Sequence, residues 1–264
     1  VHFKYIGGEL LYVDRQQGYG SADRPIYIAG SKIRIEKCLF AGAQNTALKV
    51  AGSEIRVQNN VFIENNRHAN FESRALLLEA DGYYQVTRNT FFNNCSDAIR
   101  ILPDPKKELP LRPEVSYNHI FNGGIFNTDC SGIYMPSKSQ GFAEVHHNWL
   151  HSVMYAFRLD LAGKELSLHH NVFWSSKRGM SVEGYGNFNI YNNTDVHNLE
   201  PSEIIRNVLH HSGTTDGSLD KSFPPIDDWN VLNNLVERFH DRIGPRERTT
   251  QLAQGRKGLL HSER

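Results

Sequence analysis

One short pattern recurs along most of the chain. In each copy an aliphatic residue is followed three positions later by asparagine, and cysteine takes that place in the first copy. Consecutive copies lie 22, 29, 29, 30, 23, 22 and 41 residues apart, a spacing that suits strands joined by loops of variable length better than helical repeats. The column consists of Cys38, Asn60, Asn89, Asn118, Asn148, Asn171, Asn193 and Asn234.

A second segment recurs inside each copy, as in ALKVAG from Ala47 and AFRLDL from Ala156. Its apolar residues alternate with variable ones, which is the period of a strand with one buried face. Two strands in each copy predict a parallel β-solenoid whose turns lie about 4.8 Å apart. At that spacing the asparagine amides can bind those of the turns above and below, so we expect a buried ladder rather than a set of ligands.

The V-x-x-N-x-F pattern, the strand GIYM from Gly132, and the strings HHNWLH and HHNVFW from His146 and His169 resemble the right-handed parallel β-helix superfamily. That superfamily includes pectate lyases, polygalacturonases and other carbohydrate-active proteins. The resemblance covers about Lys32 to Arg238 and implies an all-β, right-handed parallel β-helix of about eight turns with an asparagine ladder. It indicates the fold more strongly than the reaction, because a fold alone does not fix chemistry.

The pattern divides the chain into three parts. Residues 1–31 are expected to form an irregular first turn, residues 32–243 the β-helix, and residues 244–264 a poorly ordered tail with little apolar periodicity. The chain begins without Met or a basic and apolar leader, which fits both a processed protein and an interior piece of a longer one. The lack of a recognisable capping helix favours the second interpretation.

Composition narrows the classes of partner. Lysine plus arginine number 29 and aspartate plus glutamate also 29, so the net charge favours neither nucleic acid nor an anionic membrane. The longest aliphatic run, Ala75 to Leu78, is far shorter than the roughly 20 residues that span a bilayer. Three cysteines allow at most one disulfide. We expect a polysaccharide or oligosaccharide as partner; the resemblance implies a secreted or cell-envelope location, and the oligomeric state stays open.

In the superfamily the first strand of each turn belongs to the floor of the substrate groove. The resemblance therefore places the ALKV-type strands on that sheet, with the long loops Leu102 to Pro113 and Pro136 to Phe142 as walls. Alternation turns the side chains of Arg158 and Asp160 outward. Stacked in register, one outward column contains Arg100, Tyr134, Arg158 and Ser181, and the next contains Leu102, Pro136, Asp160 and Glu183.

This patch supplies candidate catalytic groups. Carboxylates on neighbouring turns, Asp160 and Glu183, suit a general acid with a nucleophile or base in glycoside cleavage. A solvated row neutralised by Arg158 is the alternative. Asp129, in the string NTD, can approach the same groove, although an aspartate before Ser-Gly also suits a turn. His151, expected on the loop that leads to the Arg158 strand, is a candidate general base or else a packed loop residue.

The remaining assignments concern binding. Tyr134, Phe142 and Tyr185 are candidates for stacking on sugar rings, and Arg100 for contact with substrate. Rows of two histidines fall short of the three or four ligands of a metal site, so none is expected there. No cofactor is expected; calcium alone is considered, because it prefers oxygen ligands, and its candidate ligands are Asp129, Asp160 and Glu183.

Three functions fit these residues. The first is a glycoside hydrolase that uses Asp160 with Glu183 or Asp129. The second is a polysaccharide lyase, in which Arg158 or Arg100 neutralises a uronate carboxylate while His151 or Tyr134 removes the proton at C5. The third is a non-catalytic solenoid that binds glycan or acts as a spacer, which would not need a localised cluster of ionisable residues.

Overall fold

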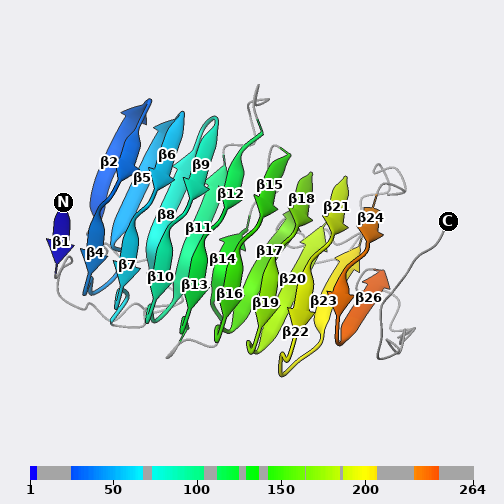
Figure 1. Cartoon of the computed structure of the whole chain (residues 1–264). Coiled ribbons are helices and arrows are strands. Elements are labelled where there is room, and N and C mark those ends of the chain that lie inside the picture. Colours follow the sequence, from blue (N-terminus) through cyan, green and yellow to red (C-terminus); the bar gives the residue numbers. More distant parts are fainter. Residues whose placement is uncertain are drawn as a thin grey trace, which may run out of the picture.

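The computed structural model describes residues 1–4, 25–67, 73–103, 112–124, 129–136, 142–163, 165–184, 187–206 and 229–243. The regular elements of these residues are strands, which form three parallel sheets that run along one solenoid (Figure 1). No described segment forms a helix capable of crossing a membrane. The parallel β-helix expected from the repeats is confirmed.

Each turn contributes one strand to each sheet, and we number the sheets by that order. The first sheet contains β2 (Ile26–Ser31), β5 (Leu48–Ser53), β8 (Arg74–Ala80), β11 (Asp97–Pro103), β14 (Ser131–Met135), β17 (Tyr155–Gly163), β20 (Arg178–Gly184), β23 (Ser202–Arg206) and β26 (Phe239–Ile243). The second contains β3 (Arg34–Glu36), β6 (Ile55–Gln58), β9 (Tyr84–Thr87), β12 (Glu114–Ser116), β15 (Ala143–His146), β18 (Leu166–His169), β21 (Phe188–Tyr191) and β24 (Trp229–Leu232). The third contains β1 (His2–Lys4), β4 (Leu39–Ala41), β7 (Val61–Ile63), β10 (Thr90–Phe92), β13 (His119–Phe121), β16 (Trp149–His151), β19 (Val172–Trp174), β22 (Thr194–Val196) and β25 (Leu235–Val236).

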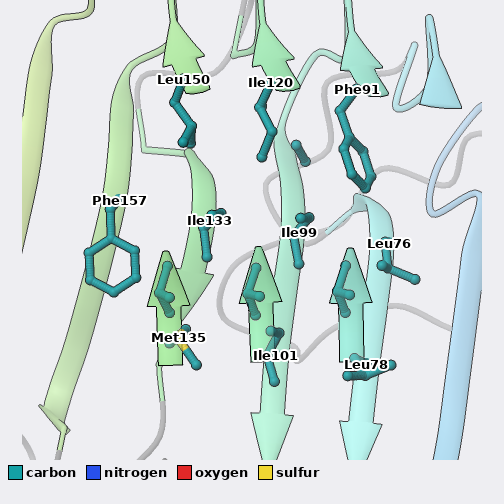
Figure 2. Close-up of a cluster of buried hydrophobic side chains, with 14 of the residues drawn as sticks. Leu76, Leu78, Phe91, Ile99, Ile101, Ile120, Ile133, Met135, Leu150 and Phe157 are labelled. Carbon is teal, nitrogen blue, oxygen red and sulfur yellow. The ribbon is translucent and has the colours of Figure 1, made fainter. Parts of the chain in front are cut away.

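The core consists of rows of apolar side chains that run along the solenoid. Leu76 of β8 pairs in register with Ile99 of β11, and both side chains are fully buried. Phe62 and Phe91 of the third sheet stack with ring centroids 4.5 Å apart. Figure 2 shows side chains of both sheets pointing into the same interior. Burying one such side chain contributes about 1.5 to 3 kcal/mol, so repetition of the rows makes the core the main source of stability.

The asparagine ladder forms as expected at the bend between the second and third sheets. The side-chain Oδ1 of Asn148 accepts hydrogen bonds from the backbone N–H and the Nδ2 of Asn118, each at 3.0 Å. Asn148 Nδ2 in turn donates to Oδ1 of Asn171 and to the carbonyl of Val115, at 3.0 and 2.8 Å. The same contacts link the column from Cys38 to Asn234.

The residue before each ladder position adopts a left-handed backbone conformation, which makes the bend tight. These residues include side chains as large as Tyr117 and His147, with φ of 56° and 53°. Such values are uncommon outside glycine. The eight residues that precede ladder positions in this conformation are Lys37, Asn59, Arg88, Tyr117, His147, His170, Asn192 and Asn233.

A second, interrupted ladder lies at the bend from the third sheet to the next turn. Asn65 Nδ2 donates to Asn94 Oδ1 at 3.1 Å, and Asn198 Oδ1 accepts the backbone N–H of Ser176 at 2.9 Å. Each of these residues follows a ladder position by five residues. That offset was the sequence signal for the second ladder, and the first column obscured it.

Removing a ladder side chain is expected to destabilise the fold. Asn118→Ala or Asn148→Ala should lower the free energy of unfolding by about 1 to 3 kcal/mol, because a buried backbone N–H of the preceding turn loses its acceptor. Urea denaturation followed by circular dichroism measures this change. As the control, Asn230→Ala removes an asparagine from an exposed pair with Asn189 and should have little effect. Unchanged midpoints for both ladder variants would contradict a stabilising ladder.

Residues 1–4 and 25–31, the described part of the expected first turn, contain strands. Two strands lie within residues 1–31: β1, which pairs with β4, and β2, which pairs with β5 along six residues. The backbone hydrogen bonds of the next turn therefore extend into this segment. The expected tail at residues 244–264 lies outside the described residues.

Candidate functional site

The expected outward column on the first sheet is present in the structure. Arg100 of β11 pairs with Tyr134 of β14, Tyr134 pairs with Arg158 of β17, and Arg158 pairs with Ser181 of β20. Glu203 of β23 continues the column. Because neighbouring turns are in register, these side chains emerge from the same face of the sheet.

The neighbouring column contains a register shift. It lies between Leu159 and Gly163 in the pairing of β17 with β20, and Asp160 belongs to this stretch. Glu183 is half-buried and pairs with Ile205 on the following turn. Leu159 still pairs with Val182, so Asp160 and Glu183 each directly follow a paired residue, and the expected row of Asp160 and Glu183 stays a prediction.

Asp160 contacts two residues of the Arg158 column. Its Oδ2 lies 2.8 Å from Nη2 of Arg158 and accepts a hydrogen bond from the Tyr134 hydroxyl at 3.1 Å. Asp160 is only 7% exposed. The other nitrogen of the same guanidinium, Nη1, donates to Asp129. Arg158 thus bridges two carboxylates that are distant in sequence, one of them buried and the other half exposed.

Aromatic rings alternate with guanidinium groups across this cluster. The Tyr134 ring lies between Arg100 and Arg158, whose Cζ atoms are 4.9 and 5.3 Å from its centroid. Arg158 also lies 5.2 Å from the Tyr155 ring, and Arg178 lies 5.5 Å from the same ring. Cation–π contacts of this kind hold flexible arginine side chains in place. We call these five residues the Arg–Tyr cluster.

Two members of the cluster were not expected from the sequence. Tyr155 and Arg178 begin their strands, three residues before Arg158 and Ser181 of the outward column. Arg178 forms ion pairs with Glu200, at 3.0 Å, and with Glu203. The sequence signal for these two residues was an aromatic or charged residue at the same offset in consecutive turns. Two-residue alternation from the outward column does not select this position, because the offset of three residues is odd.

Burial and charge determine the protonation of the central phenol. Burial raises the pKa of Tyr134, and the nearby negative charge of Asp160 raises it further. The phenol therefore stays protonated at neutral pH and acts as a hydrogen-bond donor. Burial opposes the charge of Arg158, yet its neighbours Asp160, Tyr134 and Asp129 outweigh that effect and keep the pKa of Arg158 above its ordinary value. The site thus holds a fixed positive charge between two carboxylates.

His151 lies elsewhere than expected. It is the last residue of β16 in the third sheet, not part of a loop beside the Arg158 strand. Its Nε2 lies 3.1 Å from Nε2 of His119, and its ring stacks on Trp174 with centroids 4.6 Å apart. Burial and His119 lower the pKa of His151. The sequence pattern shows the third sheet only through the residue two places after each ladder asparagine, such as Phe62 and Phe91, so the place of His151 at the end of such a short strand was missed.

The other candidate residues do not join the cluster in the described structure. Phe142 is 47% exposed and immediately precedes β15 of the second sheet. Tyr185 lies outside the described residues, as do 104–111 and 137–141 of the loops expected as groove walls. No group of three or more histidine, cysteine, aspartate or glutamate side chains with metal-binding geometry is present among the described residues. Calcium at Asp129, Asp160 and Glu183 stays a prediction.

An apolar pocket opens at the C-terminal end of the core. Met180, Ile190, Val231 and Phe239 are among its lining residues. Val231 and Phe239 lie on β24 and β26, the last described strands of their sheets, whereas Met180 and Ile190 belong to an earlier turn and are buried. The apolar lining of the pocket differs from the charged Arg–Tyr cluster.

The fold and the cluster define a class: a parallel β-solenoid that carries ionisable and aromatic side chains on the outer face of its first sheet. Residues 17–195 match the family described as the right-handed beta helix region, so the chain belongs to the right-handed β-helix family. Comparison with curated proteins and with solved structures gave no match. The family includes carbohydrate-active enzymes and also proteins without catalytic activity.

Proposed function

We propose that this protein is a carbohydrate-active enzyme that hydrolyses a polysaccharide at the outer face of its first sheet. One arrangement carries the proposal. Arg158 bridges the carboxylates of Asp129 and Asp160, and the Tyr134 hydroxyl donates a hydrogen bond to Asp160. A solenoid that served only as a spacer would not need a buried carboxylate held by two donors, because burying a charge is costly unless it is paired.

The two carboxylates differ in exposure, which supports a division of roles between them in glycoside cleavage. Asp160 is fixed by Arg158 and Tyr134, which suits a group that stabilises positive charge at the anomeric carbon or attacks it. The side chain of Asp129 is 46% exposed, against 11% for Asp160, which suits proton exchange with the leaving oxygen. Both carboxylates bind the same guanidinium group, and their separation in the substrate complex would decide between a retaining enzyme, at about 5 to 5.5 Å, and an inverting one, at about 6.5 to 9.5 Å.

The second candidate function is a polysaccharide lyase acting on a uronate polymer. It is favoured by the two guanidinium groups of Arg100 and Arg158 on either side of Tyr134, since arginine binds carboxylates in a bidentate manner. In this reaction a base removes the proton at C5, the bond from C4 to the glycosidic oxygen breaks, and a C4–C5 double bond forms. The raised pKa of Tyr134 keeps its phenol protonated at neutral pH, so the phenol is not in the form that removes the proton at C5, and we place hydrolysis first.

Product analysis distinguishes these functions. The full chain is incubated with a panel of neutral and uronate-containing polysaccharides, and new reducing ends and ultraviolet absorbance are both followed. Reducing ends without absorbance support the hydrolase, whereas absorbance from an unsaturated uronate supports the lyase. Retention of the chain on an immobilised glycan that it fails to cleave would favour the non-catalytic glycan-binding solenoid instead. A polysaccharide substrate also suits the secreted or cell-envelope location that we propose with this function.

A further inference from the structure

Two pairs of adjacent histidines lie next to each other on the second sheet, which is not the sheet of the Arg–Tyr cluster. His146 ends β15 and pairs in register with His169, which ends β18. His147 and His170 follow in left-handed conformations, with φ of 53° and 54°. The rings of His146 and His169 stack with centroids 5.0 Å apart, and those of His147 and His170 do the same.

Within each pair the same ring nitrogens converge. Nδ1 of His146 lies 2.8 Å from Nδ1 of His147, and Nδ1 of His169 lies 2.9 Å from Nδ1 of His170. Two imidazole nitrogens this close need a shared proton or a metal ion between them. For metal–nitrogen bonds of about 2.0 to 2.1 Å, this separation corresponds to an angle of about 90° at the ion. That is the angle between neighbouring ligands in square-planar Cu²⁺ and Ni²⁺ sites.

Glu114 contacts His146 at Nε2 and so leaves Nδ1 of His146 available to a metal ion. Oε1 of Glu114 lies 3.4 Å from His146 Nε2, so the carboxylate favours a proton on Nε2 and a lone pair on Nδ1. Without an ion, His147 then donates its Nδ1 proton to that lone pair. When an ion binds, His147 adopts its other neutral tautomer with the proton on Nε2, so both rings remain neutral and no net proton is released.

Each pair of imidazoles is open to solvent on one side. His147 and His170 are exposed, so an ion can reach each pair from solvent.

We propose that His146 and His147 form a bidentate site for a divalent transition-metal ion, with Cu²⁺ bound most tightly, and that His169 and His170 form an equivalent, weaker site. One ion cannot serve all four rings, because midway between pairs about 5 Å apart it would lie about 2.9 Å from each nitrogen, too far for coordination. Two ions at adjacent pairs repel, and Glu114 beside His146 favours the first pair. Water completes each coordination sphere.

The test is a titration of the full chain with a copper(II) salt, followed by calorimetry and by electron paramagnetic resonance. His147→Asn is a suitable variant, because asparagine already occupies this left-handed position at Asn59, Asn192 and Asn233. It should weaken the tightest site at least about 10-fold and remove the nitrogen coupling of two imidazoles. His170→Asn should remove only the weaker ion. Melting curves without metal confirm that each variant is folded.

The matched control removes another adjacent pair of the sequence, His210 and His211, by a double change to alanine. This variant should keep the tight copper site. The proposal is overturned if the His147→Asn and His170→Asn double variant binds Cu²⁺ as tightly as the parent, or if the control loses the tight site instead. Equal or tighter binding of Zn²⁺ by the parent would contradict the square-planar assignment.

Discussion

The Asp160→Asn variant is expected to cleave the polysaccharide substrate at least about 10²-fold more slowly than the parent. Asparagine keeps the shape of the side chain, but it lacks the negative charge that stabilises or attacks the anomeric carbon, and loss of such a group typically costs 10² to 10⁴ in rate. Initial rates of reducing-end release measure the change. We expect the same direction, with a smaller loss, if Asp160 only positions Arg158.

Stability must be measured beside activity, since Asp160 is buried against Arg158. Loss of its charge is expected to lower the free energy of unfolding by about 1 to 3 kcal/mol. Assays are therefore run well below the melting transition of both proteins. Glu79→Gln is the matched control, because Glu79 also lies on the first sheet and pairs with Lys49 at 2.9 Å, outside the cluster. Equal activity of the parent and Asp160→Asn would exclude a catalytic role for Asp160.

A second large effect is expected at Asp195, which occupies an inward position of β22. Asp195 pairs in register with Phe173 of β19. A carboxyl group therefore occupies the core position that an aromatic ring occupies in the preceding turn. Burial raises the pKa of Asp195 to about 7, although hydrogen bonds from Ser202 and Asn198 lower it. Gly179 accommodates this side chain, since a Cβ there would lie 2.0 Å from its Oδ1.

The raised pKa makes stability depend on pH. The folded protein binds this proton more tightly than the unfolded chain, so its contribution is full below the unfolded pKa of about 4 and is lost as pH rises through about 7. Each pH unit in that interval costs about 1.4 kcal/mol. Between about pH 5.5 and pH 8.5 the parent should therefore lose about 2 kcal/mol through Asp195.

The Asp195→Asn variant is expected to lack this contribution. The free energy of unfolding of the variant minus that of the parent should be about 2 kcal/mol larger at about pH 8.5 than at about pH 5.5, because the amide cannot ionise. Urea denaturation of both proteins at the two pH values measures the difference, and comparison with the parent cancels the titration of other groups. A difference independent of pH would show that Asp195 does not titrate in this interval.

The sequence by itself determined the solenoid, its asparagine ladder and the outward column of the first sheet. Each of these depends on short-range periodicity: two-residue alternation selects the face of a strand, and the recurring asparagine fixes which residues of successive turns meet. For that reason Arg100, Tyr134, Arg158 and Ser181 could be placed together before the structure was known.

Only the tertiary structure decided what these side chains contact. Arg158 bridges Asp160 and Asp129, and the pairing of β17 with β20 shifts beyond Leu159. Alternation assumes an unbroken strand, so it cannot anticipate such a shift. It also cannot specify the rotamers of arginine or the paired nitrogens of His146 and His147, because packing against neighbouring turns sets those directions.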